Sequence, residues 1–168
     1  DVCVDLRENE VTTPILVLYA EQETNMKVRV LNVGADDYLT KPFHLEELML
    51  RIKGMLKRKM WYNSSVTEIP SFTFGNNKID FENFSASNSQ EEFQLTPLEA
   101  AFMKYLIDKK DKIVTREELL ENVWHTNPTL ETRTVDNFIA RLRKYFEEDP
   151  SNPRFIVSVR GKGYSFRP

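Results

Sequence analysis

The chain has 168 residues, of which 40% are hydrophobic and 29% charged, a composition typical of one large or two small soluble globular domains. No apolar run approaches the roughly 18 residues that span a membrane, and no secretory signal peptide is recognisable. A single cysteine, Cys3, excludes an internal disulfide and favours a reducing compartment, so we expect a cytoplasmic protein with no membrane partner.

The net charge is −3, but the charges are unevenly distributed along the chain. Residues 133–168 hold eight Lys or Arg against four Asp or Glu, whereas the preceding residues carry the acidic excess. A basic segment on an acidic chain is compatible with local contacts to phosphate groups and with little non-specific binding to nucleic acid. Composition alone would favour the alternative, an ordinary solvated surface.

Residues 1–59 alternate between helical and strand patterns, which favours an α/β fold with a parallel sheet and crossover helices. The patterns predict the end of a helix at 1–8, a doubly buried strand at 15–19, a helix at 23–33 stopped by Gly34, a short strand at 38–40 and a helix at 45–56. Two full strands bury little surface, so we expect upstream residues or another chain to cover this sheet.

Residues 60–70 have no apolar periodicity and end at a proline, which predicts an interdomain linker. Residues 71–168 predict a separate α+β domain. Four short strand-like pieces, at 72–74, 78–81, 84–87 and 90–93, precede two helices that begin with capping boxes after Thr96 and Thr115. The second of these helices should extend through Trp124.

The helix predicted at 133–146 has an apolar face and a polar face. The apolar face comprises Val135, Ile139, Leu142 and Phe146, and the polar face comprises Thr134, Asn137, Arg141 and Lys144. Amide, guanidinium and ammonium groups are the chemistry that contacts base edges and phosphates. Alone, the helix could equally be an ordinary amphipathic surface helix. A basic hairpin with a Gly-Lys-Gly turn follows it, however, and the combination favours a winged helix-turn-helix.

Residues 13–18 (TPILVL) and 34–43 (GADDYLTKPF) resemble the C-terminal half of a two-component receiver domain, a doubly wound, flavodoxin-like fold. The resemblance implies that Lys41 pairs with a phosphoryl group, that Tyr38 is the aromatic switch and that the Lys41–Pro42 bond is cis. Tyr19 departs from the family, which has Ser or Thr there, and this puts ordinary phosphorylation switching in doubt. The phosphoacceptor aspartate and the acidic Mg²⁺-binding pair would lie before Asp1. We therefore expect no metal or other cofactor in this chain, and Mg²⁺ only if that half of the receiver is present.

Receivers of the winged-helix subclass dimerise through their last two helices and the strand between them. The matching charges here are Lys27, Asp36, Asp37, Glu47 and Arg51. We expect cross-subunit ion pairs between Lys27 and Glu47 and between Asp37 and Arg51, which would set register and partner choice more than affinity. The alternative is that these are separate surface charges.

Residues 95–99 (LTPLE), 123–124 (VW), 133–136 (RTVD), 141–144 (RLRK) and 159–166 (VRGKGYSF) resemble the effector domain of OmpR/PhoB-type response regulators. The resemblance implies contacts to bases from Asn137, Ala140 and Arg141. It implies contacts to phosphates from Arg133, Thr134, Arg143 and the Trp124 backbone, and a wing at 155–166 that carries Arg160 and Lys162. Lys144, on the polar face of the helix, is a further DNA-binding candidate. An ion pair with Glu147 is the alternative for Arg143.

These patterns predict a sequence-specific, DNA-binding transcriptional regulator of a two-component phosphorelay in the bacterial cytoplasm. Helix 133–146 would enter the major groove and the wing the adjacent minor groove, with dimerisation through the receiver. The family implies two further partners, a sensor histidine kinase and RNA polymerase, the latter contacted through residues 125–132. The alternative is a phosphorylation-independent regulator, or an interaction module whose receiver remnant sequesters partners. No nucleophile–base set, metal-ligand spacing or phosphate-binding glycine loop predicts an enzyme.

Overall fold

The computed structural model describes residues 2–20, 34–64, 70–124 and 133–168. Its N-terminal part contains helix α1 (Val2–Glu8), strand β1 (Leu16–Ala20), strand β2 (Asp37–Lys41) and helix α3 (Leu45–Ser64). The two strands pair in parallel, from Leu16 opposite Asp37 to Ala20 opposite Lys41. The predicted strands and flanking helices are thus confirmed, and so is the cis Lys41–Pro42 bond. The expected burial of the first strand on both faces is wrong, because Leu18 is 40% exposed and Tyr19 is the only buried residue of β1. The helix predicted at 23–33 lies outside the described residues.

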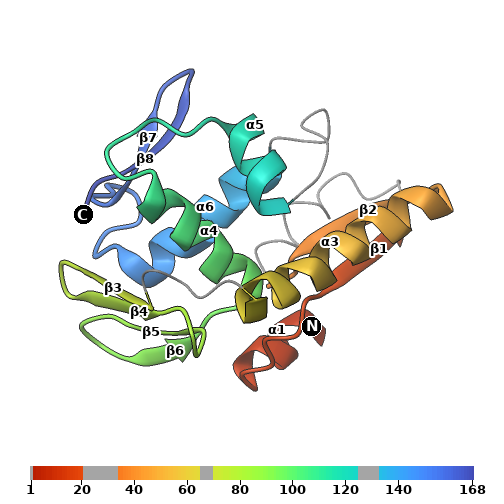
Figure 1. Cartoon of the computed structure of the whole chain (residues 1–168), viewed down its shortest axis with the longest axis horizontal. Coiled ribbons are helices and arrows are strands. Elements are labelled where there is room, and N and C mark those ends of the chain that lie inside the picture. The colour runs from red at the N-terminus through yellow and green to blue at the C-terminus, as the bar shows by residue number, and fades with distance from the viewer. Residues whose placement is uncertain (1, 21–33, 65–69, 125–132) are drawn as a thin grey trace.

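Helix α3 is longer than predicted and runs to Ser64, so a linker that begins at residue 60 is wrong. The prediction relied on the loss of apolar periodicity after residue 59. That loss does not end a helix, however, and no Gly or Pro occurs between Gly54 and Pro70. The C-terminal end of α3 lies beside one end of α4 of the second domain in Figure 1.

The second domain begins with a four-stranded antiparallel sheet in the order β3–β4–β5–β6. Its strands are β3 (Ser71–Phe74), β4 (Asn77–Asp80), β5 (Ser85–Ser87) and β6 (Glu92–Gln94). Ile79 pairs with Phe72 on one side and with Ala86 on the other, and Ala86 pairs with Phe93, so apolar side chains from all four strands share one face. The four predicted strand pieces are confirmed to within two residues.

Helices α4 (Pro97–Asp108), α5 (Arg116–Leu119) and α6 (Arg133–Phe146) follow, and α5 continues as a π-helical turn, η1 (Leu120–Trp124). The first predicted capping box is confirmed, because Thr96 Oγ1 accepts from the Glu99 amide at 3.2 Å while Glu99 Oε2 accepts from the Thr96 amide at 2.7 Å. Thr115 caps α5 by accepting from the Glu118 amide at 3.1 Å. The Glu118 carboxylate instead accepts from the Tyr105 hydroxyl at 2.7 Å, so the second predicted capping box is only half formed. The path to Trp124 is helical as predicted, although its last turn is not α-helical.

The chain closes with an antiparallel hairpin, β7 (Ile156–Val159) and β8 (Gly163–Phe166), whose strands pair from Ile156 opposite Phe166 to Val159 opposite Gly163. We call this hairpin the wing. The predicted apolar face of α6 is confirmed, because its four side chains are each at most 2% exposed and pack in the core. None of the helices in the described ranges is both long and apolar enough to cross a membrane.

Candidate nucleic-acid interface

The exposed side of α6 carries part of the predicted DNA-contacting set. Ala140 and Lys144 are exposed, and Asn137 is partly exposed two turns before Lys144 and on the same side of the helix. Arg133 and Thr134 occupy the first two positions of α6, but their side chains lie outside the described residues. The structure therefore brings an amide, a methyl and an ammonium group together on one open helical surface.

The wing places two more of the predicted residues at an exposed tip. Arg160 and Lys162 flank Gly161, and all three are exposed. Gly161 has a φ of +70°, a left-handed conformation that suits glycine, and it allows the strands to reverse direction over the Gly-Lys-Gly turn. In Figure 1 the wing rises away from the four-stranded sheet, so its tip is free of the rest of the described chain.

Arg143 joins the recognition helix to the first strand of the wing. Its Nε and Nη2 donate to the Ile156 carbonyl at 2.9 and 2.7 Å, and Nη2 also donates to Ser158 Oγ at 2.9 Å. Burial lowers the pKa of Arg143. The alternative ion pair with Glu147 is wrong, because that carboxylate instead accepts from the backbone amides of residues 154, 155 and 156 at 2.7–2.9 Å.

A second contact joins the start of α6 to the other strand of the wing. The Tyr164 hydroxyl donates to Asp136 Oδ1 at 2.6 Å, and Arg116 Nε donates to the same oxygen at 2.6 Å. The Arg116 guanidinium also lies over the Tyr164 ring, 5.0 Å from its centroid. Burial and the Asp136 carboxylate raise the pKa of Tyr164 to about 12. With Arg143, these contacts fix the angle between α6 and the wing.

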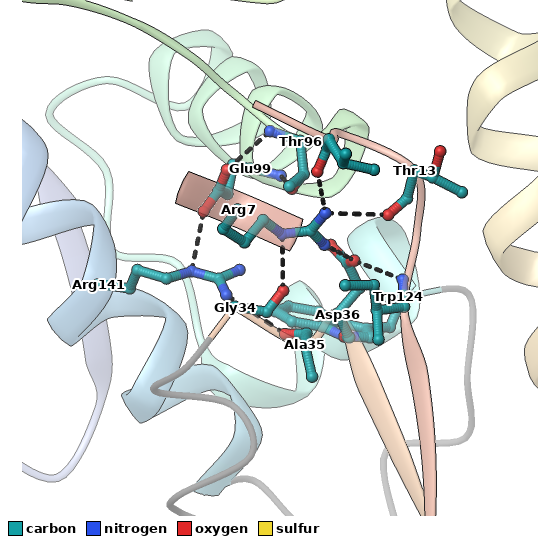
Figure 2. Close-up of polar contacts among 11 residues, drawn as sticks. Arg7, Thr13, Gly34, Ala35, Asp36, Thr96, Glu99, Trp124 and Arg141 are labelled. Atoms are coloured by element: carbon teal, nitrogen blue, oxygen red, sulfur yellow. Dashed lines mark hydrogen bonds and ion pairs between the residues drawn. The ribbon is translucent and has the colours of Figure 1, made fainter. Parts of the chain in front are cut away.

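Arg141 does not lie on the exposed side of α6, so its predicted position there is wrong. The side chain is 6% exposed and forms an ion pair with Glu99 of α4, with 2.8 Å between Nε and Oε1. Its Nη1 donates to the Ala35 carbonyl at 3.3 Å (Figure 2). The guanidinium also lies 4.2 Å from the centroid of the Phe138 ring. The helical wheel places Arg141 at the border of the two faces, and the buried Glu99 draws it inward.

The Trp124 side chain lies on the receiver side rather than beside the exposed surface of α6, and the phosphate contact expected from its backbone stays a prediction. Its indole packs edge-on against Phe102 and Phe138, with ring centroids 5.5 and 4.9 Å apart. Its Nε1 donates to the Asp36 carbonyl at 3.4 Å. Arg141 and Trp124 thus contact consecutive backbone carbonyls of the receiver, and we call this contact the interdomain seam.

Arg7 organises the receiver side of the seam, and no sequence pattern singled it out. Its guanidinium donates to the carbonyls of Gly34 and Thr13 at 2.9 and 3.0 Å, to that of Val11, and to Asp36 Oδ2 at 2.7 Å (Figure 2). Asp36 is 1% exposed, and burial raises its pKa. Only the spatial meeting of α1 with the start of β2 reveals this role.

The charges expected at a dimer interface are paired within the chain. Asp37 binds Arg51 at 2.9 Å, and Arg51 also binds Glu47 at 2.8 Å. Helix α3 brings Arg51 over the start of β2 in the same chain, and the expected cross-subunit Asp37–Arg51 pair stays a prediction. Asp36 likewise forms an ion pair within the chain, with Arg7. Lys27, and with it the expected Lys27–Glu47 pair, lies outside the described residues.

Of the residues expected to support phosphorylation, Tyr19 and Lys41 lie at the other end of the two strands, and Tyr38 is the second residue of β2. Tyr19 and Tyr38 are buried against each other, with ring centroids 6.0 Å apart, and Lys41 is exposed at the end of β2. The family's Mg²⁺ would require an acidic cluster near them. Within the described part of the chain no group of three or more His, Cys, Asp or Glu residues is placed to hold a metal ion, so these residues do not fit Mg²⁺.

Comparison with known proteins identifies both halves of the chain. Residues 1–53 match the response regulator receiver domain, and residues 90–166 match the C-terminal domain of transcriptional regulatory proteins. The transcriptional regulatory protein PhoP of Escherichia coli K12 is 36% identical over 160 residues, covering 95% of this chain and 69% of PhoP. The chain spans 66 to 70% of the lengths of this and two other curated relatives.

Solved structures give the same result. The response regulator DrrB, described as a Thermotoga maritima OmpR/PhoB homologue, superposes with a TM-score of 0.54 at 32% identity over 99% of this chain and 72% of DrrB. The DNA-binding domain of Klebsiella pneumoniae RstA, solved in complex with the RstA box, superposes with a TM-score of 0.53 at 29% identity over 59% of this chain and 98% of that domain. The chain belongs to the OmpR/PhoB-type response regulators, transcriptional regulators in which a receiver domain precedes a winged-helix DNA-binding domain.

Proposed function

We propose that this protein binds double-stranded DNA with α6 in the major groove and the wing on the adjacent minor groove. The observation that carries the proposal is the fixed angle between these two exposed elements, which Arg143 sets at one end and the Asp136–Tyr164 hydrogen bond at the other. A major groove about 12 Å wide admits a single α-helix. RstA, whose DNA-binding domain is similar, was solved bound to DNA, which supports the same role here.

We assign each exposed side chain of α6 and the wing tip a contact with a base, a phosphate or the minor groove. Asn137 is suited to a bidentate contact with adenine, and the Ala140 methyl is suited to the methyl group of thymine. Lys144, Arg160 and Lys162 supply positive charge for phosphates or for a narrow A·T-rich minor groove. Arg133 and Thr134, at the helix start, are expected to contact phosphate as well. Arg141 is not part of this set, because its guanidinium is buried against Glu99.

Selection from a random duplex library, followed by fluorescence anisotropy on the selected sequence, tests the proposal. Asn137→Ala should cost about 1–3 kcal/mol and relax the preference at one base pair. Arg160→Ala should weaken binding to all sequences and lower the slope of log K against log salt by about 1. Lys78→Ala is the matched control, because Lys78 is exposed on β4 of the four-stranded sheet, apart from the wing tip. Retention of full affinity and preference by both test variants would refute the proposal.

We further propose the partners and setting that the family implies. The protein would act in the bacterial cytoplasm by binding DNA rather than by turning over a substrate. It would dimerise through the receiver, respond to a sensor histidine kinase and contact RNA polymerase through residues 125–132. In a complete receiver Lys41 would pair with the phosphoryl group, and the switch residue Tyr38 would share its buried position with Tyr19.

A further inference from the structure

Arg141 is held by three different kinds of contact, and none of them leaves its guanidinium facing the exposed side of α6. Glu99 supplies a buried opposite charge from α4, Phe138 supplies a ring face from α6 itself, and Ala35 supplies a carbonyl from the receiver. A guanidinium without acceptors is costly to bury, so these contacts must be made together. The Ala35 contact is the one that crosses between domains.

The receiver offers this carbonyl from a turn that is itself rigid. Arg7 donates to Gly34 on one side of Ala35 and to Asp36 on the other, and Asp36 Oδ2 also accepts from the Ile15 amide at 2.8 Å. Gly34 adopts a φ of +100°, and a Cβ there would lie 2.6 Å from Arg7 Cγ. The carbonyls of Ala35 and Asp36 are therefore fixed in place before Arg141 and Trp124 reach them.

The two domains also approach closely beside this turn. A Cβ on Gly54 of α3 would lie 3.3 Å from the Trp124 carbonyl, so the receiver's last helix is nearly in contact with the backbone at the end of η1. Trp124 in turn packs on Phe138 of α6. Two routes therefore connect the receiver to the recognition helix, one through Arg141 directly and one through Trp124.

We propose that Arg141 is a positioning residue that locks the recognition helix to the receiver and is not a residue that contacts bases. The orientation of α6 is then set by the receiver's Gly34–Asp36 turn, and the two domains move as one body while the seam is closed. The DNA role of α6 rests on the function proposed above, but the lock itself is a property of the free protein and can be measured without DNA.

Electron paramagnetic resonance distance measurements test the lock. In a Cys3→Ser background of the full chain, spin labels at Glu46 of α3 and Lys78 of β4, both exposed, report the separation of the domains. We expect one narrow distance peak. Trp124→Phe keeps an aromatic ring between Phe102 and Phe138 but removes the donor to Asp36, and it should broaden that peak.

Arg141→Met is the most direct test, but alone it could unfold the protein, because it would leave the Glu99 carboxylate buried without its cation. The double variant Glu99→Gln/Arg141→Met removes both charges, while the glutamine oxygen can still accept from the Thr96 amide. It should broaden the distance peak as Trp124→Phe does. Lys110→Met, which removes one exposed positive charge as Arg141→Met alone removes a buried one, is the control and should leave the peak unchanged. A narrow peak in the folded double variant would overturn the proposal.

A second readout separates a lock from a base contact. Against a panel of DNA sites that each differ at one base pair, the double variant should change affinity by a common factor at every site. Loss of discrimination confined to one base pair would show that Arg141 contacts that base and would overturn the proposal, whatever the distance peak does. Absence of specific DNA binding by the unaltered chain would refute only the proposed function, since the distance measurement would still decide the lock.

Discussion

Arg143 provides the sharpest test of how the recognition helix and the wing act together. Arg143→Lys keeps the positive charge but loses the planar fork, whose Nε and Nη2 both reach the Ile156 carbonyl. If Arg143 served mainly as a charge near phosphate, Arg143→Lys would keep the DNA affinity. If Arg143 sets the angle of the wing, Arg143→Lys would lower the DNA affinity. The substitution therefore distinguishes the two roles without changing the net charge.

The magnitude follows from the three bonds that are lost. Two of them share one carbonyl and count together, and the third, to Ser158 Oγ, lies at an exposed position. A hydrogen bond to a charged group contributes about 1.5–3 kcal/mol, and the partial exposure of Arg143 favours the lower end. We expect the variant to lose about 1.5 kcal/mol of unfolding free energy in urea, and about tenfold in DNA affinity, because tenfold corresponds to about 1.4 kcal/mol.

A double-mutant cycle with the wing tip decides whether the loss is positional. Arg160→Ala should cost less DNA affinity in the Arg143→Lys background than in the unaltered chain, because a loose wing no longer delivers Arg160 to its groove. The coupling should fall in the range of about 0.5–3 kcal/mol. Arg167→Lys, at an exposed position beyond β8, is the matched control. Additivity of Arg143→Lys and Arg160→Ala to within about 0.5 kcal/mol would refute the reasoning.

Two further predictions concern stability. Gly163→Ala should destabilise the protein by about 3 kcal/mol, because Gly163 has a φ of +149° and a Cβ there would lie 2.1 Å from the Val114 carbonyl oxygen. Gly161→Ala should cost only about 1–2 kcal/mol, because Gly161 has a φ of +70° but open space around it. Urea titrations that gave equal losses of unfolding free energy for the two variants would contradict this reasoning. Burial, and next the Glu99 carboxylate, raise the pKa of Tyr145 from 10.0 to about 12. The folded state therefore disfavours the phenolate, and the stability that Tyr145 contributes is fully present below pH 10 and is lost as the pH rises toward 12. Tyr145→Phe should make the fall in unfolding free energy over that window shallower, and an unchanged slope would contradict the assignment.

The elements of both domains could be predicted because their patterns are local. The strand at 15–19, the capping box of Thr96 and Glu99 and the heptad-like face of α6 each lie within one stretch of chain, and each is confirmed. The burial of that strand on both faces was not, because it depends on neighbours that lie elsewhere in the fold. The end of α3 was missed for the same reason. The sequence around residue 60 loses its apolar face, but it contains no Gly or Pro to break the helix.

The functional surface could be predicted only where a side chain has no competing partner elsewhere in the fold. Ala140 and the basic wing residues lie where their spacing placed them. Arg141 does not, because the group that attracts it, Glu99, is distant in sequence. The Asp36 carbonyl that accepts from the Trp124 indole is equally distant. A helical wheel shows which residues share a face of one helix, but it contains no information about a buried carboxylate on another helix. The charges of Asp37 and Arg51 were identified correctly, but one chain already brings them together.

The receiver contributes to the seam through backbone carbonyls, which every residue possesses. The contact therefore requires particular side chains only on the effector domain, where Arg141 and Trp124 supply both hydrogen-bond donors. A receiver from a relative could be exchanged for this one if its turn had the same shape, whatever side chains it carried. Evolution by domain shuffling would then preserve the contact while leaving little covariation between the two domains to reveal it.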